Sequence, residues 1–211
     1  MKLYQSVGPN PRVVNMFIAE KGVHIVREEI DIMGGANRQA EFLRLNPGGQ
    51  SPALLLDSGR VISEIIAICE YLEEIHPEPV LVGSDAEQRA LTRMWTRRID
   101  LNIVEPMANG FRFAEGLAMF KDRMHCIPHA ATDLKEIAQR GLRWLDAQIG
   151  NTPFVTGERF TLADILLFCF LDFGAKVGQP LDQGNRNIVR WYDSVKARPS
   201  ATESVHMSER R

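Results

Sequence analysis

The period of the hydrophobic pattern changes near residue 80 of this 211-residue chain. Before that point, short apolar runs typical of strands alternate with runs at helical spacing, in the order β-α-β-α-β-β-α. Beyond it, the pattern predicts helices alone, and the polar, proline-containing stretch between the two regions has the composition of a linker. We therefore expect an α/β domain over residues 1–79, a linker over 80–86 and an all-helical domain over 87–211.

The start of the first helix is marked by a glycine and two prolines. A short strand pattern stops at Gly8-Pro9-Asn10-Pro11, and helical spacing follows. Asn10 is a favourable N-cap residue and Pro11 suits the first helical position, so we expect the helix to begin there. A second strand is expected within residues 23–32, with Val26 on its apolar face.

Composition and charge exclude several classes of protein. The net charge is −2, and the first 80 residues carry 7 Lys and Arg against 11 Asp and Glu, so no basic field for nucleic acid is present. The longest apolar run, residues 165–171, is too short to span a bilayer, and the sequence shows no apolar leader pattern. The three cysteines form no CxxC motif. They fit reduced thiols, so we expect a cytoplasmic protein without membrane or nucleic-acid partners.

Three segments carry distinctive motifs, in a fixed order along the chain. They are Asn46-Pro47-Gly48-Gly49-Gln50-Ser51-Pro52-Ala53-Leu54, Ser63-Glu64-Ile65-Ile66-Ala67-Ile68-Cys69-Glu70-Tyr71-Leu72 and Gly157-Glu158-Arg159-Phe160-Thr161-Leu162-Ala163-Asp164. They resemble, in turn, the NPxGxVP signature, the ESxAIxxYL pattern and the helical-domain capping signature of the cytosolic glutathione transferases. The resemblance implies a thioredoxin-like domain that binds glutathione, followed by an all-helical domain that binds a hydrophobic electrophile.

The resemblance also implies how glutathione is held. In the family, the proline at the position of Pro52 follows a cis peptide bond, which turns the backbone of Ser51 toward the cysteinyl part of the tripeptide. Glu64 is expected to meet the γ-glutamyl ammonium, and the backbone N–H of Ile65 to meet the γ-glutamyl carboxylate. The remaining expected glutathione contacts are Gln50 and, through the glycine carboxylate, Arg38.

Thr161 and Asp164 have the spacing of a capping box. Thr161 is the expected N-cap of a helix, and a carboxylate three residues later can return a hydrogen bond to the N-cap backbone. We expect these two residues to stabilise the fold, with no part in the chemistry.

The side chain that usually activates glutathione is missing. A free thiol has a pKa of about 8.5, so the protein must stabilise the thiolate to use it near neutral pH. Alignment on the family's SPxxR arrangement places Gly8 where serine or cysteine would stand, which resembles an atypical fungal and bacterial group with a Gly-Pro turn. That resemblance implies stabilisation by a helix amino end and by groups of the second domain. The candidate catalytic residues are therefore Ser6, Asn10, His125 and His129.

The expected reaction is conjugation of the glutathione thiolate to a small hydrophobic electrophile, as in detoxification. Phe111 and Phe113 are candidates for the electrophile site, although an aromatic stripe is more often core. By resemblance we expect a homodimer with glutathione as co-substrate and no metal. For the histidines, solvent exposure without a catalytic role is the alternative, as plain capping is for Asn10.

Two other functions remain open at this stage. The same site can support glutathione-dependent peroxide reduction. A non-catalytic interaction or ligand-carrying module is the second alternative, favoured by Gly8 and by Ile65, which stands where the family has serine. Gln50, Ser51, Pro52 and Glu64 favour the enzyme, because a scaffold has no physical need for peptide-binding geometry.

Overall fold

The computed structural model describes residues 1–209, which form two compact units. Unit 1 contains residues 1–81 together with the C-terminal residues from Arg198 onward, and unit 2 contains residues 82–197. From the sequence we expected these C-terminal residues to belong to the helical domain. They group with unit 1 because the helix over residues 9–21 binds their backbone and side chains, as described below.

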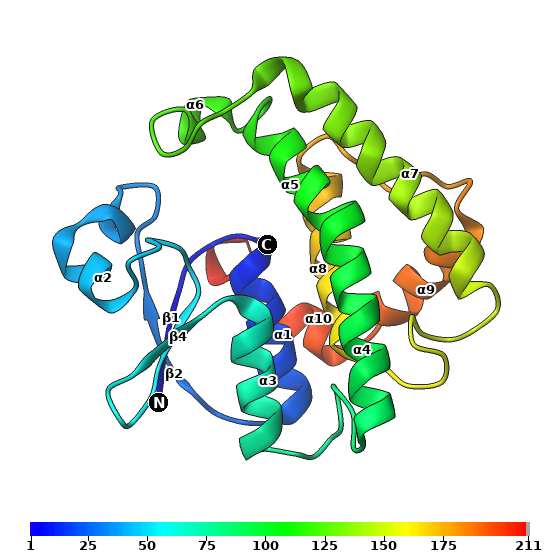
Figure 1. Ribbon diagram of the computed structural model, residues 1–211, viewed down its shortest axis with the longest axis horizontal. Coiled ribbons are helices and arrows are strands. Elements are labelled where there is room, and N and C mark those ends of the chain that lie inside the picture. Colours follow the sequence, from blue (N-terminus) through cyan, green and yellow to red (C-terminus); the bar gives the residue numbers. More distant parts are fainter. Residues whose placement is uncertain (210–211) are drawn as a thin grey trace. The chain divides into compact units, whose positions relative to one another are not determined.

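Unit 1 has the element order expected from the sequence, and Figure 1 shows α1 and α3 on one side of its sheet and α2 on the other. Its elements are β1 (Lys2–Gln5), α1 (Pro9–Lys21), β2 (Val26–Glu29), the 3-10 turn η1 (Ala36–Arg38), α2 (Ala40–Leu45), β3 (Ala53–Leu55), β4 (Val61–Ser63), α3 (Ile65–Ile75), α10 (Pro199–Glu203) and the 3-10 turn η4 (Met207–Glu209).

The four strands form a mixed sheet in the order β2-β1-β3-β4. β1 pairs in parallel with β2 and antiparallel with β3, which pairs antiparallel with β4. Side chains alternate across the sheet. Leu3 and Leu54 are fully buried, whereas Tyr4 packs with Phe42 of α2 and with Ala53. The sheet therefore has an apolar layer on each face.

Two local expectations were wrong. α1 begins at Pro9 with Gly8 as its N-cap, so Asn10 is the second helical residue and makes no capping hydrogen bond. A proline at the first helical position and a glycine free to adopt an unusual backbone conformation explain the earlier start. β2 is an edge strand whose side chains are all exposed, including Val26 at 55%.

Unit 2 is helical, as expected, apart from an isolated bridge between Phe154 and Gly157. Its helices are α4 (Ala86–Ile99), the π-helical η2 (Asp100–Val104), α5 (Glu105–Arg112), α6 (Leu117–Phe120), the 3-10 turn η3 (Pro128–Ala130), α7 (Ala131–Ile149), α8 (Leu162–Lys176) and α9 (Arg186–Lys196). The Asp85 side chain accepts the Gln88 N–H and caps α4. No helix within residues 1–209 combines the length and apolar character needed to cross a bilayer.

The capping box at the start of α8 is confirmed. Asp164 is fully buried, and one carboxylate oxygen accepts the Thr161 N–H at 2.9 Å. The other oxygen accepts the Val155 N–H and the Trp191 Nε1–H, both at 2.8 Å. Burial raises the pKa of Asp164 to about 6, against the opposing effect of these hydrogen bonds. Asp164 thus joins three segments of unit 2.

Candidate functional site in unit 1

Three motif segments converge at one end of the sheet. In the strand register, Tyr4 lies opposite Ala53, and Ala53 lies opposite Ser63. Because β1 and β4 run antiparallel to β3, the residues after β1, before β3 and after β4 meet at the same end. Ser6, Pro52 and Glu64 occupy these positions, so the structure brings together residues separated by up to 58 positions in the sequence.

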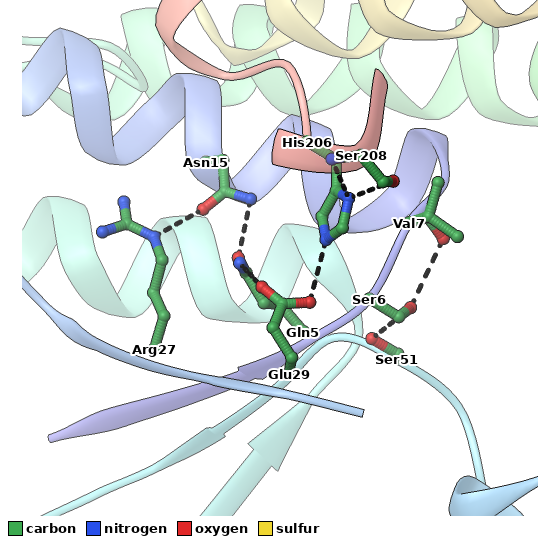
Figure 2. Close-up of polar contacts among 9 residues, drawn as sticks. All are labelled: Gln5, Ser6, Val7, Asn15, Arg27, Glu29, Ser51, His206 and Ser208. Atoms are coloured by element: carbon green, nitrogen blue, oxygen red, sulfur yellow. Dashed lines mark hydrogen bonds and ion pairs between the residues drawn. The ribbon is translucent and has the colours of Figure 1, made fainter. Parts of the chain in front are cut away.

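The side chains of Ser6 and Ser51 are in direct contact at this end. The Ser6 hydroxyl donates to Ser51 Oγ at 3.0 Å, and Figure 2 shows the two side chains facing each other. Ser6 is only 4% exposed. The Ser51–Pro52 peptide bond is cis, as expected from the motif. The Ser6 side chain therefore faces the loop that carries the expected glutathione-binding backbone.

Two buried asparagines hold the loop before β3. Asn46 donates from Nδ2 to the Gln50 carbonyl at 2.8 Å, and Asn37 donates from Nδ2 to the Gly49 carbonyl at 2.6 Å. Neither side chain was among the residues expected at the site. The turn-rich Asn-Pro-Gly-Gly composition around Asn46 was the available signal, whereas nothing near Asn37 in the sequence indicated its contact.

Glu64 has a strained backbone conformation. Its φ of 71° makes it the one non-glycine residue with positive φ among residues 1–209. Such a conformation costs about 1–3 kcal/mol and persists where the surrounding structure imposes it. The Glu64 side chain is exposed and makes no capping hydrogen bond to α3. The carboxylate is therefore available to an external cation. Ile65 is the first residue of α3, so its N–H has no intrahelical partner and can meet an anion.

The amino end of α1 offers fewer donors than a typical helix. The first N–H groups of a helix lack intrahelical partners, but the first and third helical residues of α1 are Pro9 and Pro11, which have no N–H. The Arg12 N–H is already bonded to the Gly8 carbonyl at 3.3 Å. Asn10 therefore supplies the first-turn N–H that remains open to an anion, and its side chain is half-buried.

Gly8 has a conformational reason to be glycine. Its φ of 129° lies in a region that residues with a Cβ rarely adopt, although a Cβ there would meet no atom within 4 Å. Backbone geometry, and not lack of space, disfavours a serine or cysteine at this position. Gln50 and Arg38, the other expected glutathione contacts in unit 1, are both exposed.

In unit 2, the two candidate histidines do not lie on one helix. His129 is in η3, whereas His125 is in the non-helical segment before it, because Pro128 begins a new turn. Both histidines are exposed. The two histidines therefore do not share a helical face, and any role for them is proposed for each residue separately.

The candidate aromatic residues of unit 2 pack as part of its interior. Phe113 is only 7% exposed. Phe111 is half-buried and makes edge contacts with Phe120 and Phe173, at centroid distances of 6.1 and 5.2 Å. Phe113 behaves as a core residue, and Phe111 is the better placed of the two to meet a ligand. Among residues 1–209, no group of three or more His, Cys, Asp or Glu side chains is arranged to hold a metal ion.

Comparison with known proteins decides the family. The family model described as "Glutathione S-transferase, N-terminal domain" matches residues 7–75, and "Glutathione S-transferase, C-terminal domain" matches residues 128–194. The chain is 31% identical over 189 residues to maleylacetoacetate isomerase of Pseudomonas aeruginosa, covering 89% of this chain and 86% of that protein. The chain belongs to the glutathione S-transferase family.

Two of the further matches cover nearly the whole chain, and a third covers about two thirds of it. Glutathione S-transferase 2 of Saccharomyces cerevisiae is 28% identical over 204 residues, covering 95% of this chain and 87% of the relative. The crystal structure of Gtt2 from the same yeast superposes with a TM-score of 0.91 at 26% identity, covering 97% of this chain and all of that one. Elongation factor 1-gamma of Homo sapiens is 36% identical over 138 residues, which are 65% of this chain and 29% of that protein.

These matches confirm the expected glutathione transferase fold, a small mixed-sheet unit followed by a helical one. Two of the similar proteins, the Pseudomonas isomerase and elongation factor 1-gamma, carry names other than transferase. Family membership therefore supports glutathione chemistry in general, and the particular activity has to be argued from the residues.

Proposed function

We propose that this protein binds glutathione in unit 1, stabilises its thiolate and conjugates it to a small hydrophobic electrophile. The observation that carries the proposal is the backbone of Glu64. A strained, exposed carboxylate at the start of α3, beside the loop that contains Ser51 and Pro52, suits a ligand with an ammonium group. A fold used only as a scaffold gains nothing from that strain.

The tripeptide is assigned to the groups that meet at this end of the sheet. The backbone of Ser51 pairs with the cysteinyl part, Glu64 meets the γ-glutamyl ammonium, and the N–H of Ile65 meets the γ-glutamyl carboxylate. Gln50 lies in the same loop, and Arg38 is the candidate partner of the glycine carboxylate. The sulfur then lies near the β1–α1 connection.

The thiolate is stabilised by the Ser6 hydroxyl and by Asn10. In the free protein the Ser6 hydroxyl donates a hydrogen bond to Ser51 Oγ. A thiolate is a charged acceptor and competes with Ser51 for that hydrogen. The Asn10 N–H adds the positive end of the α1 dipole. From unit 2, His125 and His129 are separate candidates for proton transfer, and Phe111 is the candidate contact for the electrophile. The thiolate attacks the electrophilic carbon, an S–C bond forms and the leaving group departs with its electron pair.

Calorimetric titration with glutathione tests the binding step. We expect saturable binding by the wild-type protein and at least a tenfold weaker affinity for Glu64→Ala, since an ion-assisted hydrogen bond contributes about 1.5–3 kcal/mol. Glu74→Ala, an exposed substitution later in α3, is the matched control. Equal affinities of the two variants would refute the assignment of Glu64.

Glutathione-dependent peroxide reduction is the second activity that the same thiolate supports. Assays with an aryl halide and with an organic hydroperoxide, each supplied with glutathione, separate the two reactions. A non-catalytic binding module, the role favoured by Gly8, Ile65 and the similarity to elongation factor 1-gamma, predicts turnover in neither assay.

The homodimer is proposed to form through exposed apolar side chains of unit 2. Four large apolar side chains of this unit are exposed: Leu91 (39%), Leu101 (49%), Ile137 (46%) and Trp144 (40%). The Trp144 ring also packs on Trp95, at a centroid distance of 5.8 Å. These residues lie on α4, η2 and α7, which border a groove of about 490 Å³. Exposed apolar surface of this kind favours a protein partner, and a second copy of this chain is the partner we assign.

Light scattering of the wild-type protein tests this assignment. We expect a mass of twice the chain, and a single-chain mass for Trp144→Glu, because a buried carboxylate would disrupt the interface. Gln148→Glu, an exposed substitution on the same helix, should leave the dimer intact. A dimer that survives Trp144→Glu would show that another surface is used.

A further inference from the structure

Two arginines bind the C-terminal segment, the residues from Arg198 to Glu209, to α1. Arg198 donates from Nε and Nη2 to the two carboxylate oxygens of Glu20, each at 2.7 Å, and Ser200 Oγ also donates to this carboxylate. Arg12, only 8% exposed, donates from Nη2 to the Ala201 carbonyl at 3.1 Å. A bidentate ion pair and a buried guanidinium fix the course of this segment along unit 1.

The charge on Glu20 is retained despite its partial burial. Burial acts to raise the pKa of this carboxyl, but the hydrogen bonds from Arg198 and Ser200, with the charge of Arg198, hold the pKa below its ordinary value. The anchor is therefore ionised at neutral pH. The Arg198–Glu20 ion pair thus holds the C-terminal segment in a course that brings the residues after α10 to the sheet.

Beyond α10, His206 binds the end of β2. Its Nε2 lies 2.9 Å from Glu29 Oε2, and its Nδ1 lies 2.7 Å from Ser208 Oγ. Nδ1 also accepts the Ser208 N–H at 3.2 Å, which assigns the hydrogen of a neutral imidazole to Nε2 and makes His206 the donor to Glu29. The His206 side chain is 20% exposed.

A chain of side-chain hydrogen bonds leads from His206 to Gln5 (Figure 2). Glu29 accepts from Gln5 Nε2, and Gln5 Oε1 accepts from Asn15 Nδ2 at 2.8 Å. Asn15 Oδ1 in turn accepts from Arg27 Nε at 3.0 Å. Both ends of the Gln5 amide are thus bonded, and the chain joins the C-terminal segment to β2, β1 and α1.

Gln5 is the last residue of β1 and directly precedes Ser6. It is 6% exposed and lies opposite Glu29 in the strand register, and its carbonyl accepts the Ile30 N–H at 2.7 Å. A residue held by both its side chain and its main chain fixes the direction in which the next residues leave the strand. Those next residues are Ser6, Val7 and Gly8, which connect β1 to α1.

We propose that His206 is a positioning residue of the glutathione site, acting through Glu29 and Gln5 to hold the Ser6–Gly8 connection in the geometry that meets the sulfur. The inference rests on the proposed function for its chemical consequence. Small displacements of a group that orients a reacting atom reduce rates strongly, because the barrier depends on alignment. The C-terminal segment is then part of the site, although it lies about 200 positions from Ser6 in the sequence.

Four single variants and one double variant of the whole 211-residue chain test the inference. His206→Ala removes the donor to Glu29, and His206→Gln restores an N–H at a similar reach. Glu29→Ala removes the acceptor and is combined with His206→Ala for a double-mutant cycle. Met207→Ala is the matched control, because Met207 is 81% exposed.

The first readout is amide hydrogen exchange in the free protein at residues 6–8, 10 and 12, because the two prolines of this segment have no N–H. We expect exchange about tenfold faster in His206→Ala, wild-type behaviour in His206→Gln and Met207→Ala, and no further effect of His206→Ala once Glu29 is alanine. This readout does not depend on glutathione. Unchanged exchange in His206→Ala would overturn the positioning role.

The second readout is glutathione conjugation, measured with the pKa of the bound thiol. We expect kcat about tenfold lower and a higher thiol pKa in His206→Ala, with recovery in His206→Gln. A wild-type protein that does not bind glutathione would refute the proposed function and leave the exchange result standing by itself. Wild-type kcat and thiol pKa in His206→Ala, in a protein that binds glutathione, would refute the inference alone.

Discussion

The hydroxyl oxygens of Ser6 and Ser51 lie 3.0 Å apart, although 45 positions separate the two residues in the sequence. One residue follows the first strand and the other precedes the cis proline. Their contact shows that the β1–α1 connection and the loop before β3 lie side by side. The donor in this contact, the Ser6 hydroxyl, lies two residues before Gly8.

Removing the Ser6 hydroxyl should raise the pKa of bound glutathione. We expect a rise of about one unit in Ser6→Ala, equivalent to about 1.4 kcal/mol of lost thiolate stabilisation. Ser51→Ala should not raise the thiol pKa, because Ser51 contributes to binding through its backbone and its hydroxyl only competes with the thiolate for the Ser6 hydrogen. Thiolate absorbance of both variants with saturating glutathione checks this, and equal values for Ser6→Ala and the wild type would exclude Ser6.

Replacing Glu64 by glycine should stabilise the protein while weakening glutathione binding. Glycine adopts positive φ without strain, so the substitution relieves the strain energy of the folded state. Glycine also adds entropy to the unfolded chain, but this effect is smaller, and we expect a net gain of about 1 kcal/mol in the free energy of unfolding. Glu74→Gly, later in the same helix, should instead lose about 1 kcal/mol. Urea unfolding distinguishes these signs. A less stable Glu64→Gly would mean that its backbone is not strained.

Restoring a serine at the usual catalytic position should fail. Gly8→Ser forces a residue with a Cβ to φ near 129°, so we expect a loss of about 1–3 kcal/mol in stability and no gain in activity. Gly48→Ala is the control, because a Cβ there makes only an ordinary contact with the Asn46 side chain. Thermal unfolding and conjugation assays check both variants, and a more active Gly8→Ser would contradict this reading of the turn.

The buried carboxyl of Asp164 should make stability depend on pH. Its pKa is about 6 in the folded chain against an ordinary value of 3.8, so the folded state keeps a proton that the unfolded chain releases. The contribution of this group to stability therefore falls as the pH rises from about 4 to about 6, by about 3 kcal/mol in total.

Comparison with Asp164→Asn isolates that contribution. We expect the variant to be less stable than the wild type, since its amide NH₂ replaces an oxygen that accepts buried N–H groups. The difference in the free energy of unfolding should shrink as the pH rises from 4 to 7, because only the wild type loses stability over this range. Urea unfolding at each pH measures it. Asp85→Asn, at the exposed start of α4, should change stability by less than about 0.5 kcal/mol throughout. A difference for Asp164→Asn that stays constant with pH would contradict the raised pKa.

The sequence predicted much of the fold because its local signals agree with the packing. The element order of unit 1 and the capping box at Thr161 and Asp164 both follow from turn chemistry and spacing. The start of α1 was misplaced because Asn10 is a better N-cap by propensity, whereas the backbone freedom of Gly8 decided the geometry. Val26 was placed inside because its β-propensity does not reveal that β2 is an edge strand.

The polar network around Gln5 was not predictable from the sequence. His206, Glu29 and Gln5 are ordinary polar residues in segments without a motif, and only tertiary folding brings them together. The same holds for the Asn37 contact with Gly49. The motifs indicated Ser51, Pro52 and Glu64 as candidate glutathione contacts. They contained no information about the side chains that fix the backbone around these three residues.

Thiolate absorbance of glutathione bound to the wild-type protein, recorded as a function of pH, tests the central claim most directly. The predicted result is saturable binding with a thiol pKa about one to two units below the free value of about 8.5. No binding, or a bound thiol that ionises at the free value, would contradict the claim that unit 1 holds glutathione as a thiolate.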